Sequence, residues 1–180
     1  MTLTPRELDA IRRHAVEEYP RESCGVLLVR DGSRRLVRCR NVQDALHARD
    51  PVRHPRDART AYFIDPADLL RIGRLETEGF AVAAIYHSHV DAGAYFSPAD
   101  RQRALLDGEP MYPDATYLVT AVLGGRAEAT AAFRWSQEAR DFVAVDLARA
   151  AWAWHERAAH LAGRAWQRLG QFVPGGKRVP

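Results

Sequence analysis

The stretch Phe-Ala-Val-Ala-Ala-Ile-Tyr-His-Ser-His, residues 80–89, joins an apolar run directly to two histidines. Its first seven residues are all apolar and follow Gly79, which is typical of a short buried strand. His87 and His89 stand two residues apart at the end of this strand. Side chains at that spacing on an extended chain project to the same side, so both imidazoles can reach one metal ion.

A carboxylate and a hydroxyl follow the histidines at useful spacing. Ser97 is a natural N-cap for the next helix, and Asp100 lies three residues later on the same side as the loop. Two imidazoles and one carboxylate leave a fourth coordination position open, as a catalytic zinc requires, whereas a structural zinc usually takes four protein ligands. We therefore predict that His87, His89 and Asp100 bind one Zn²⁺ ion per chain.

Hydrolysis at such a zinc also requires a base and a donor to the developing oxyanion. Glu22 directly precedes the apolar segment 24–30, and packing does not explain a carboxylate at that place. We predict that Glu22 is the general acid/base and that the Ser97 hydroxyl is the donor. The simpler alternatives are a solvated loop position for Glu22, a helix cap for Ser97 and a dipole-favoured first-turn carboxylate for Asp100.

Helix and strand patterns alternate around this stretch. Segment 43–60 has no period and is expected to be a long loop, and such loops are usually functional or disordered. The remaining order predicts an α/β fold with a mixed central sheet flanked by helices. The helices are expected over 5–19, from Asp65-Pro66 onward and over 97–106, and the strands over 24–30, 34–41, 80–86, 116–123, 128–135 and 141–147.

The five polar residues together resemble the signature of the JAMM (MPN-plus) zinc metalloproteases. That signature is a Glu, then His-x-His, seven residues, a Ser, two residues and an Asp, and this chain fills it without a gap. The resemblance covers roughly residues 5–147 and implies a layered, cytidine-deaminase-like domain. It also implies that the two histidines and the aspartate bind zinc, that the glutamate is the acid/base, and that the serine stabilises the tetrahedral intermediate.

The resemblance also implies a substrate. The short bacterial members act on an amide or isopeptide bond after the C-terminal Gly-Gly of a ubiquitin-like or sulphur-carrier protein. Many relatives carry Pro after the second histidine, whereas this chain has Val90-Asp91, and Asp91 is expected to add negative charge near the metal. The alternatives are a non-catalytic MPN-type scaffold and a zinc deaminase, but the latter class requires a Pro-Cys-x-x-Cys pair that this sequence lacks.

The texture of the sequence changes near Ala148. Apolar residues then recur at steps of three and four, so we expect a catalytic domain over 1–147 and an amphipathic helix with a tail over 148–180. Trp152 and Trp166 flank the apolar stripe of this helix. The stripe is expected to dock on the domain or to form a homodimer seam.

Composition narrows the classes of partner. The net charge is +3 and the pI about 9.1, without a long basic run, so no nucleic acid is expected. No run approaches the ~18 apolar residues of a membrane span.

Cys24 and Cys39 lie in segments that are expected to be neighbouring strands, but reduced thiols in a cytoplasmic protein are favoured. Segment 49–59 is arginine-rich and is either a solvated loop or a substrate-docking element. The remaining histidines are expected at the surface: His14, His47, His54, His155 and His160.

Overall fold

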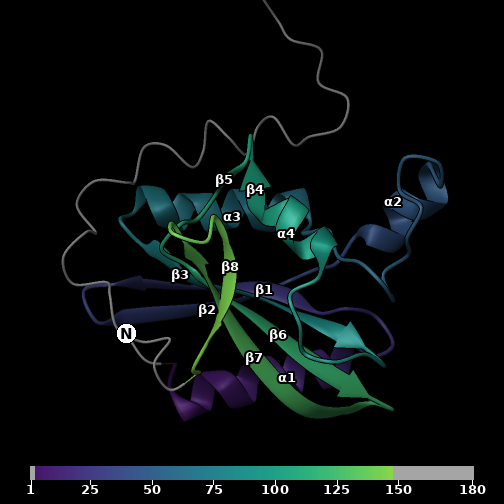
Figure 1. Ribbon diagram of the computed structural model, residues 1–180, viewed down its shortest axis with the longest axis horizontal. Helices are drawn as coiled ribbons and strands as arrows, with labels where there is room; N and C mark the ends of the chain where they lie inside the picture. The colour runs from purple at the N-terminus through teal and green to yellow at the C-terminus, as the bar shows by residue number, and fades with distance from the viewer. Residues whose placement is uncertain (1–2, 148–180) are drawn as a thin grey trace, which may run out of the picture.

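The computed structural model describes residues 3–147, and the predictions made for 148–180 lie outside the described residues. A six-stranded mixed sheet forms its centre, in the order β2-β1-β3-β6-β7-β8 (Figure 1). The strands are β1 (Cys24–Arg30), β2 (Ser33–Cys39), β3 (Ala81–Val90), β6 (Thr116–Leu123), β7 (Arg126–Ser136) and β8 (Asp141–Val145). The helices are α1 (Pro5–Glu18), α2 (Gln43–Arg49), α3 (Pro66–Thr77) and α4 (Pro98–Ala104), and β4 (Leu105–Leu106) pairs with β5 (Glu109–Pro110).

The sheet is mixed because one of its pairs is parallel. Strand β3 runs antiparallel to β1 but parallel to β6, and α4 lies in the crossover between β3 and β6. Helix α1 covers one face of the sheet, while α3, α4 and the β4–β5 hairpin cover the other (Figure 1). The expected α/β fold with flanking helices is confirmed for the described residues.

Each face has its own apolar cluster. The cluster between α1 and the sheet consists of Ile11 from the helix and of Leu27, Ala84, Tyr86, Leu118 and Ala132 from the strands. The opposite cluster is larger and includes Val26, Leu28, Ile72, Phe80, Val119 and Phe133. From Ala84 onward, successive side chains of β3 serve the two faces in turn, whereas Val82 and Ala84 lie on opposite faces because the pairing with β1 shifts register between them.

Local signals placed α1 and the first hairpin correctly. Thr4 caps α1 in a capping box with Glu7, and the helix ends at Glu18, one residue short of the expected end. The turn between β1 and β2 uses positive φ angles at Asp31 (46°) and Gly32 (81°). A two-residue hairpin of this kind needs left-handed backbone at both positions, which Asp-Gly supplies.

Three boundaries differ from expectation. The segment 43–60 contains α2, a seven-residue helix whose N-cap Val42 makes no side-chain cap, so the sequence carries no start signal for it. Strand β3 runs on through His87 and His89 because its pairing with β6 extends to Val122. Helix α4 ends at Ala104 because the next two residues pair with β5.

His14 was expected at the surface, and this prediction is wrong. Its side chain is 3% exposed, and Nδ1 lies 2.9 Å from the Tyr86 hydroxyl. Burial and the Arg38 charge lower the pKa of His14 to about 4, so the ring is neutral at pH 7.

Cys24 and Cys39 are paired in register across β1 and β2 and are both free thiols. Within residues 3–147, no helix is long and apolar enough to cross a membrane.

Candidate metal centre

Strand alternation places both histidines on the α3 face of the sheet. Tyr86 packs in the cluster under α1, so His87 points the other way, where Tyr62 stacks on its ring at a centroid distance of 4.8 Å. His89, two residues further along β3, lies beside His87 with ring centroids 5.1 Å apart. The two rings are buried, with 1% and 6% exposure.

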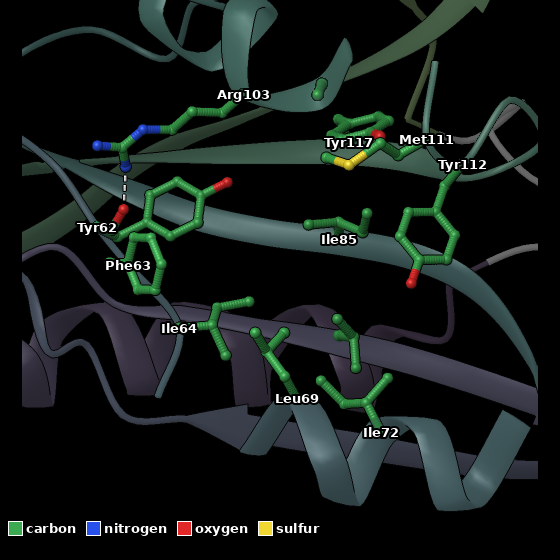
Figure 2. A pocket seen from close by; sticks show the side chains of 12 residues that line it. Tyr62, Phe63, Ile64, Leu69, Ile72, Ile85, Arg103, Met111, Tyr112 and Tyr117 are labelled. Carbon is green, nitrogen blue, oxygen red and sulfur yellow. Dashed lines mark hydrogen bonds between the residues drawn. The ribbon is translucent and has the colours of Figure 1, made fainter. Parts of the chain in front are cut away.

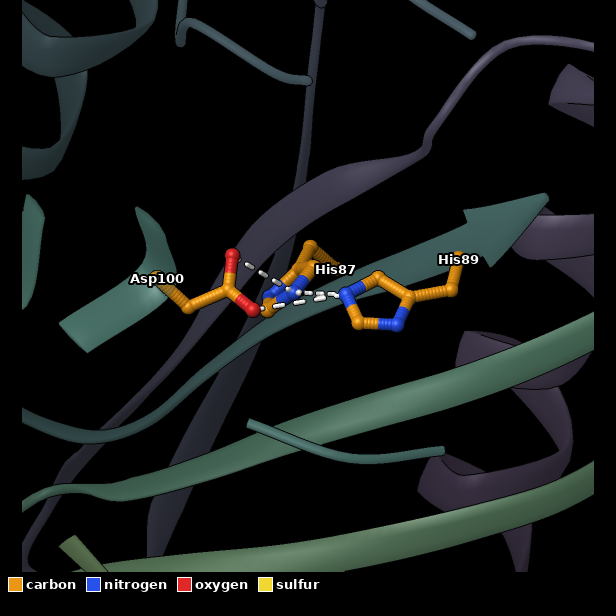
Figure 3. A group of neighbouring side chains, drawn as sticks. All are labelled: His87, His89 and Asp100. Atoms are coloured by element: carbon orange, nitrogen blue, oxygen red, sulfur yellow. Dashed lines mark hydrogen bonds and ion pairs between the residues drawn. The ribbon is translucent and has the colours of Figure 1, made fainter. Parts of the chain in front are cut away.

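Asp100 meets both rings from the first turn of α4 (Figure 3). Its Oδ1 lies 3.3 Å from His87 Nε2, and its Oδ2 lies 3.3 Å from His89 Nε2. The two Nε2 atoms are themselves 3.3 Å apart. The three side chains that the sequence selected as ligands therefore converge on one point, and they form the metal-competent group found within residues 3–147.

The spacing of these donor atoms fits a zinc ion. Four ligands around zinc with bonds of 2.0–2.1 Å form a tetrahedron whose edges are about 3.3–3.4 Å. The 3.3 Å separation of the two Nε2 atoms matches such an edge, and each Nε2 lies 3.3 Å from a different oxygen of Asp100. Three protein ligands leave the fourth corner open, which is the arrangement of catalytic rather than structural zinc.

Hydrogen bonds orient the ligands for this role. The Nδ1 of His89 lies 2.9 Å from the Gly93 carbonyl oxygen, so Nδ1 holds the proton and Nε2 presents its lone pair. The Ser97 backbone N–H donates to Asp100 Oδ2 at 2.8 Å. Burial lowers the pKa of His87, which favours its neutral, ligating form. Against the cost of burial, interactions with His87, His89 and Ser97 lower the pKa of Asp100 below its usual range.

Glu22 is held beside this group by its backbone. Its N–H donates to the Ala58 carbonyl at 2.7 Å, and its carbonyl accepts from the Asn41 side chain at 2.9 Å. The next residue, Ser23, donates its N–H to the Ser88 hydroxyl at 2.8 Å. The serine between the two histidines thus ties the glutamate segment to the ligand strand.

The Glu22 carboxyl faces the ligands across a cavity of about 250 Å³, whose lining includes Glu22, His89, Ser97 and Asp100. Glu22 is 5% exposed, and burial raises its pKa to about 8, against an opposing effect of His89. A solvated loop position for Glu22 is therefore excluded. A carboxyl group poised near neutral pH can both accept and return a proton.

Ser97 caps α4 and lines the cavity at the same time. Its Oγ accepts the Asp100 N–H at 3.2 Å, and the reciprocal bond from Ser97 N–H to the Asp100 carboxylate completes a capping box. Because the cap uses Oγ as an acceptor, the hydroxyl proton is left to donate to another group.

Asp91 is engaged away from the ligands. Its carboxylate accepts from the Tyr19 hydroxyl at 3.2 Å, from Arg59 at 2.6 Å and from the Gly124 N–H at 2.9 Å. Its neighbours Val90 and Ala92 line the cavity. Asp91 therefore joins the end of α1, the 50–64 segment and the β6–β7 turn.

Sequence reasoning missed three residues around the centre. Tyr62 stacks on His87, Arg103 donates to the Tyr62 carbonyl, and Asn41 bridges Glu22 and Ala61. Tyr62 and Arg103 also line a neighbouring apolar cavity of about 160 Å³ (Figure 2), so both residues belong to the lining of both cavities. All three lie in or contact the 41–64 segment, where periodicity offers no signal.

Comparison of the chain with known protein families agrees with this geometry. The family described as prokaryotic homologs of the JAB domain matches residues 4–138. The chain belongs to this family. The matched range contains all five residues of the predicted constellation and every strand of the sheet except β8.

Two curated proteins match about half of this chain. A probable TtuB-protein conjugate cleaving protease of Thermus thermophilus is 36% identical over 98 residues, which are 54% of this chain and 58% of that protein. The tail tip assembly protein K of Escherichia phage N15 is 33% identical over 96 residues, which are 53% of this chain and 33% of that protein. The matched region spans little more than half of the first relative and a third of the second.

Two solved structures share the fold. A Salinibacter ruber protein aligns with a TM-score of 0.52 at 28% identity, and a Desulfitobacterium hafniense protein with 0.57 at 19% identity. In both cases the alignment covers 81% of this chain and 89% of the other. The layered JAB architecture thus recurs in separately determined structures.

Proposed function

We propose that this JAB domain is a zinc metallopeptidase that hydrolyses an amide or isopeptide bond. The observation that carries the proposal is the group of two imidazoles and one carboxylate, whose donor atoms lie within 4.8 Å of one another, with Glu22 and Ser97 lining the same cavity. In this proposal His87, His89 and Asp100 hold one Zn²⁺ ion. The bound ion supplies Lewis acidity toward water and toward the carbonyl of the scissile bond.

The chain's own residues then handle protons and charge. Glu22 takes the proton of the attacking water and returns it to the leaving nitrogen, which its buried position beside the ligands favours. Ser97 donates its hydroxyl proton to the oxyanion that develops on the carbonyl oxygen. The capping box fixes the position of Ser97 on α4, so the donor is in place before substrate binds.

The proposed substrate is the C-terminal Gly-Gly tail of a ubiquitin-like or sulphur-carrier protein. Two glycines carry no side chains, so such a tail can enter a narrow cleft and bring its last carbonyl to a buried centre. The name of the Thermus relative, which describes cleavage of TtuB–protein conjugates, supports this class of substrate.

A non-catalytic interaction module is the alternative. The name of the phage relative, an assembly protein, favours it. A scaffold has no need of a buried glutamate with a raised pKa beside an open metal position, and this chain retains the complete constellation. The peptidase is therefore the preferred function.

We further propose that residues 1–147 form the catalytic unit and that 148–180 are an appendage able to mediate dimerisation. The family match ends at residue 138 and the last described strand at Val145, which supports a boundary near this point. Truncation before Ala148 that leaves zinc binding intact but converts a dimer into a monomer in light scattering would support both parts. Loss of zinc would place the appendage in the core.

Metal analysis tests the central claim. Protein prepared without chelator should contain close to one zinc per chain, and His89→Ala or Asp100→Asn should lose most of it. The matched control is His47→Ala, a histidine whose Nδ1 bonds the His54 carbonyl away from the cavity, and it should retain the metal. A wild-type chain that binds no zinc even after addition of one equivalent would exclude the mechanism.

A further inference from the structure

The cavity beside the metal ligands is rich in positive charge. Three guanidinium groups line it, from Arg56, Arg59 and Arg103, against the two carboxyl groups of Glu22 and Asp100. Two of the arginines come from the arginine-rich segment 49–59, whose charges the proposed chemistry does not use. The third comes from α4, one turn after Asp100.

The two carboxyl groups do not neutralise these arginines. Both oxygens of Asp100 face the histidine nitrogens, and one of them also accepts the Ser97 N–H. Glu22 adds at most one negative charge, so the two carboxyl groups together offset two of the three guanidinium charges. The cavity is therefore net positive even before a divalent cation binds.

The Arg59 guanidinium already pairs with a carboxylate of the protein. Its guanidinium lies 2.6 Å from the Asp91 carboxylate, which the Gly124 N–H and the Tyr19 hydroxyl also hold. This network positions the arginine segment at the rim of the cavity. The charges that remain for a ligand are those of Arg56 and Arg103.

Arg103 and Arg56 use few of their donors within the protein. Arg103 is half-buried, lies over the Tyr62 ring at 5.6 Å and donates to the Tyr62 carbonyl (Figure 2). Arg56 donates to the Thr60 carbonyl at 3.2 Å. A guanidinium has five N–H donors, so one carbonyl leaves most of them for another acceptor. A charge that is partly removed from water is costly unless an anion pairs with it.

We propose that Arg103 and Arg56 form a carboxylate-binding subsite beside the metal centre. This inference rests on the proposed function and sharpens its substrate: the bond that is cleaved has a free carboxylate close to it. A Gly-Gly tail has no charged side chain at its end, so the carboxylate must come from the group that leaves. It is either the α-carboxylate of a terminal amino acid or an acidic side chain next to an acceptor lysine.

Three matched peptides separate these sources. Each carries the same tail ending in Gly-Gly; the first continues into one amino acid with a free α-carboxylate, and the second into the same residue as its carboxamide. The third is an isopeptide to a lysine that is followed by an aspartate, with all termini blocked. Binding to zinc-loaded Glu22→Gln protein is measured by calorimetry, and hydrolysis by zinc-loaded wild type is measured in parallel.

We expect a carboxylate-bearing peptide to bind on the order of 10- to 100-fold tighter than the carboxamide, as charged hydrogen bonds allow. Preference for the first peptide identifies an α-carboxylate, and preference for the third identifies an acidic side chain. Arg103→Gln should reduce the ratio of the two affinities, carboxylate-bearing peptide over carboxamide, to near one. Arg103→Lys should keep part of this preference. The control Arg101→Gln, on the same helix but paired with Asp141, should leave the ratio unchanged.

The two proposals fail differently. Equal binding of all three peptides, or a preference that survives in both Arg103→Gln and Arg56→Gln, overturns the subsite even where wild type hydrolyses every peptide. A carboxylate preference that Arg103→Gln removes, without cleavage by wild type, supports the subsite and overturns the peptidase. Because the ratio is compared within each variant, a general loss of folded protein cancels from it.

Discussion

The two faces of the sheet are built from alternate residues of the same strands, yet they are organised differently. Under α1, β3 contributes Ala84 and Tyr86 to a closed apolar cluster, and the Tyr86 hydroxyl bonds the buried His14 ring. On the opposite face, the same strand contributes His87 and His89 to a group of polar donors that borders two cavities. Adjacent residues of β3 therefore contribute alternately to apolar packing on one face and to the candidate metal group on the other.

The α1 face supports the metal face. Ser88, the residue between the ligands, bonds Ser23 and so fixes the backbone next to Glu22. Stability is expected to depend mainly on the α1 face and hydrolysis on the other. Variants on each face test this division between stability and hydrolysis, and they are given in order of expected effect, the largest first.

On the metal face, Glu22→Gln should reduce hydrolysis of a Gly-Gly substrate on the order of 10²–10⁴-fold, because the amide cannot accept the water's proton. Zinc content and the thermal midpoint should stay close to wild type. The matched control is Glu17→Gln, whose side chain pairs with Arg38 at the surface. Steady-state kinetics with parallel metal analysis checks the expectation. Near-wild-type turnover in Glu22→Gln would assign the base elsewhere.

On the α1 face, Gly25→Ala should destabilise the protein by about 3 kcal/mol, the upper part of the range for overpacking. A Cβ at this position would clash with the Val37 carbonyl oxygen and the Tyr86 hydroxyl, and backbone cannot yield cheaply. Urea unfolding measures the change. Gly93→Ala is the control, because its Cβ would meet a first neighbour at an ordinary 3.7 Å. Equal stability of the two variants would contradict the close packing of β1 on β3.

Acid should weaken the α1 face through His14. Its pKa is about 4 in the folded protein and about 6.5 when unfolded, so the unfolded chain takes up a proton first as pH falls. Stability from this group is complete above pH 6.5 and is lost between pH 6.5 and 4, and the loss amounts to about 2 kcal/mol at pH 5. Chemical unfolding of wild type and His14→Gln at pH 5 and 7.5 isolates this effect. An identical pH dependence in both would remove His14 as its source.

The sequence by itself determined which residues form the candidate centre. Residues 87–100 hold the three proposed ligands and a capping serine on one strand and the helix start that follows it, so their spacing depends on local geometry alone. Glu22 was also identified from the sequence, because apolar packing does not account for a carboxylate directly before a buried strand. The mixed sheet followed from the order of helix and strand patterns.

Only the tertiary structure decided what surrounds the centre. Asn41, Tyr62 and Arg103 reach it through contacts that span 19 to 41 residues of sequence. The segment that carries Asn41 and Tyr62, with its short helix α2, has no period. His14 was expected at the surface because its partner, Tyr86, lies 72 residues away. Periodicity reports which face of an element is apolar, whereas the partner of a polar side chain is set by how distant segments pack.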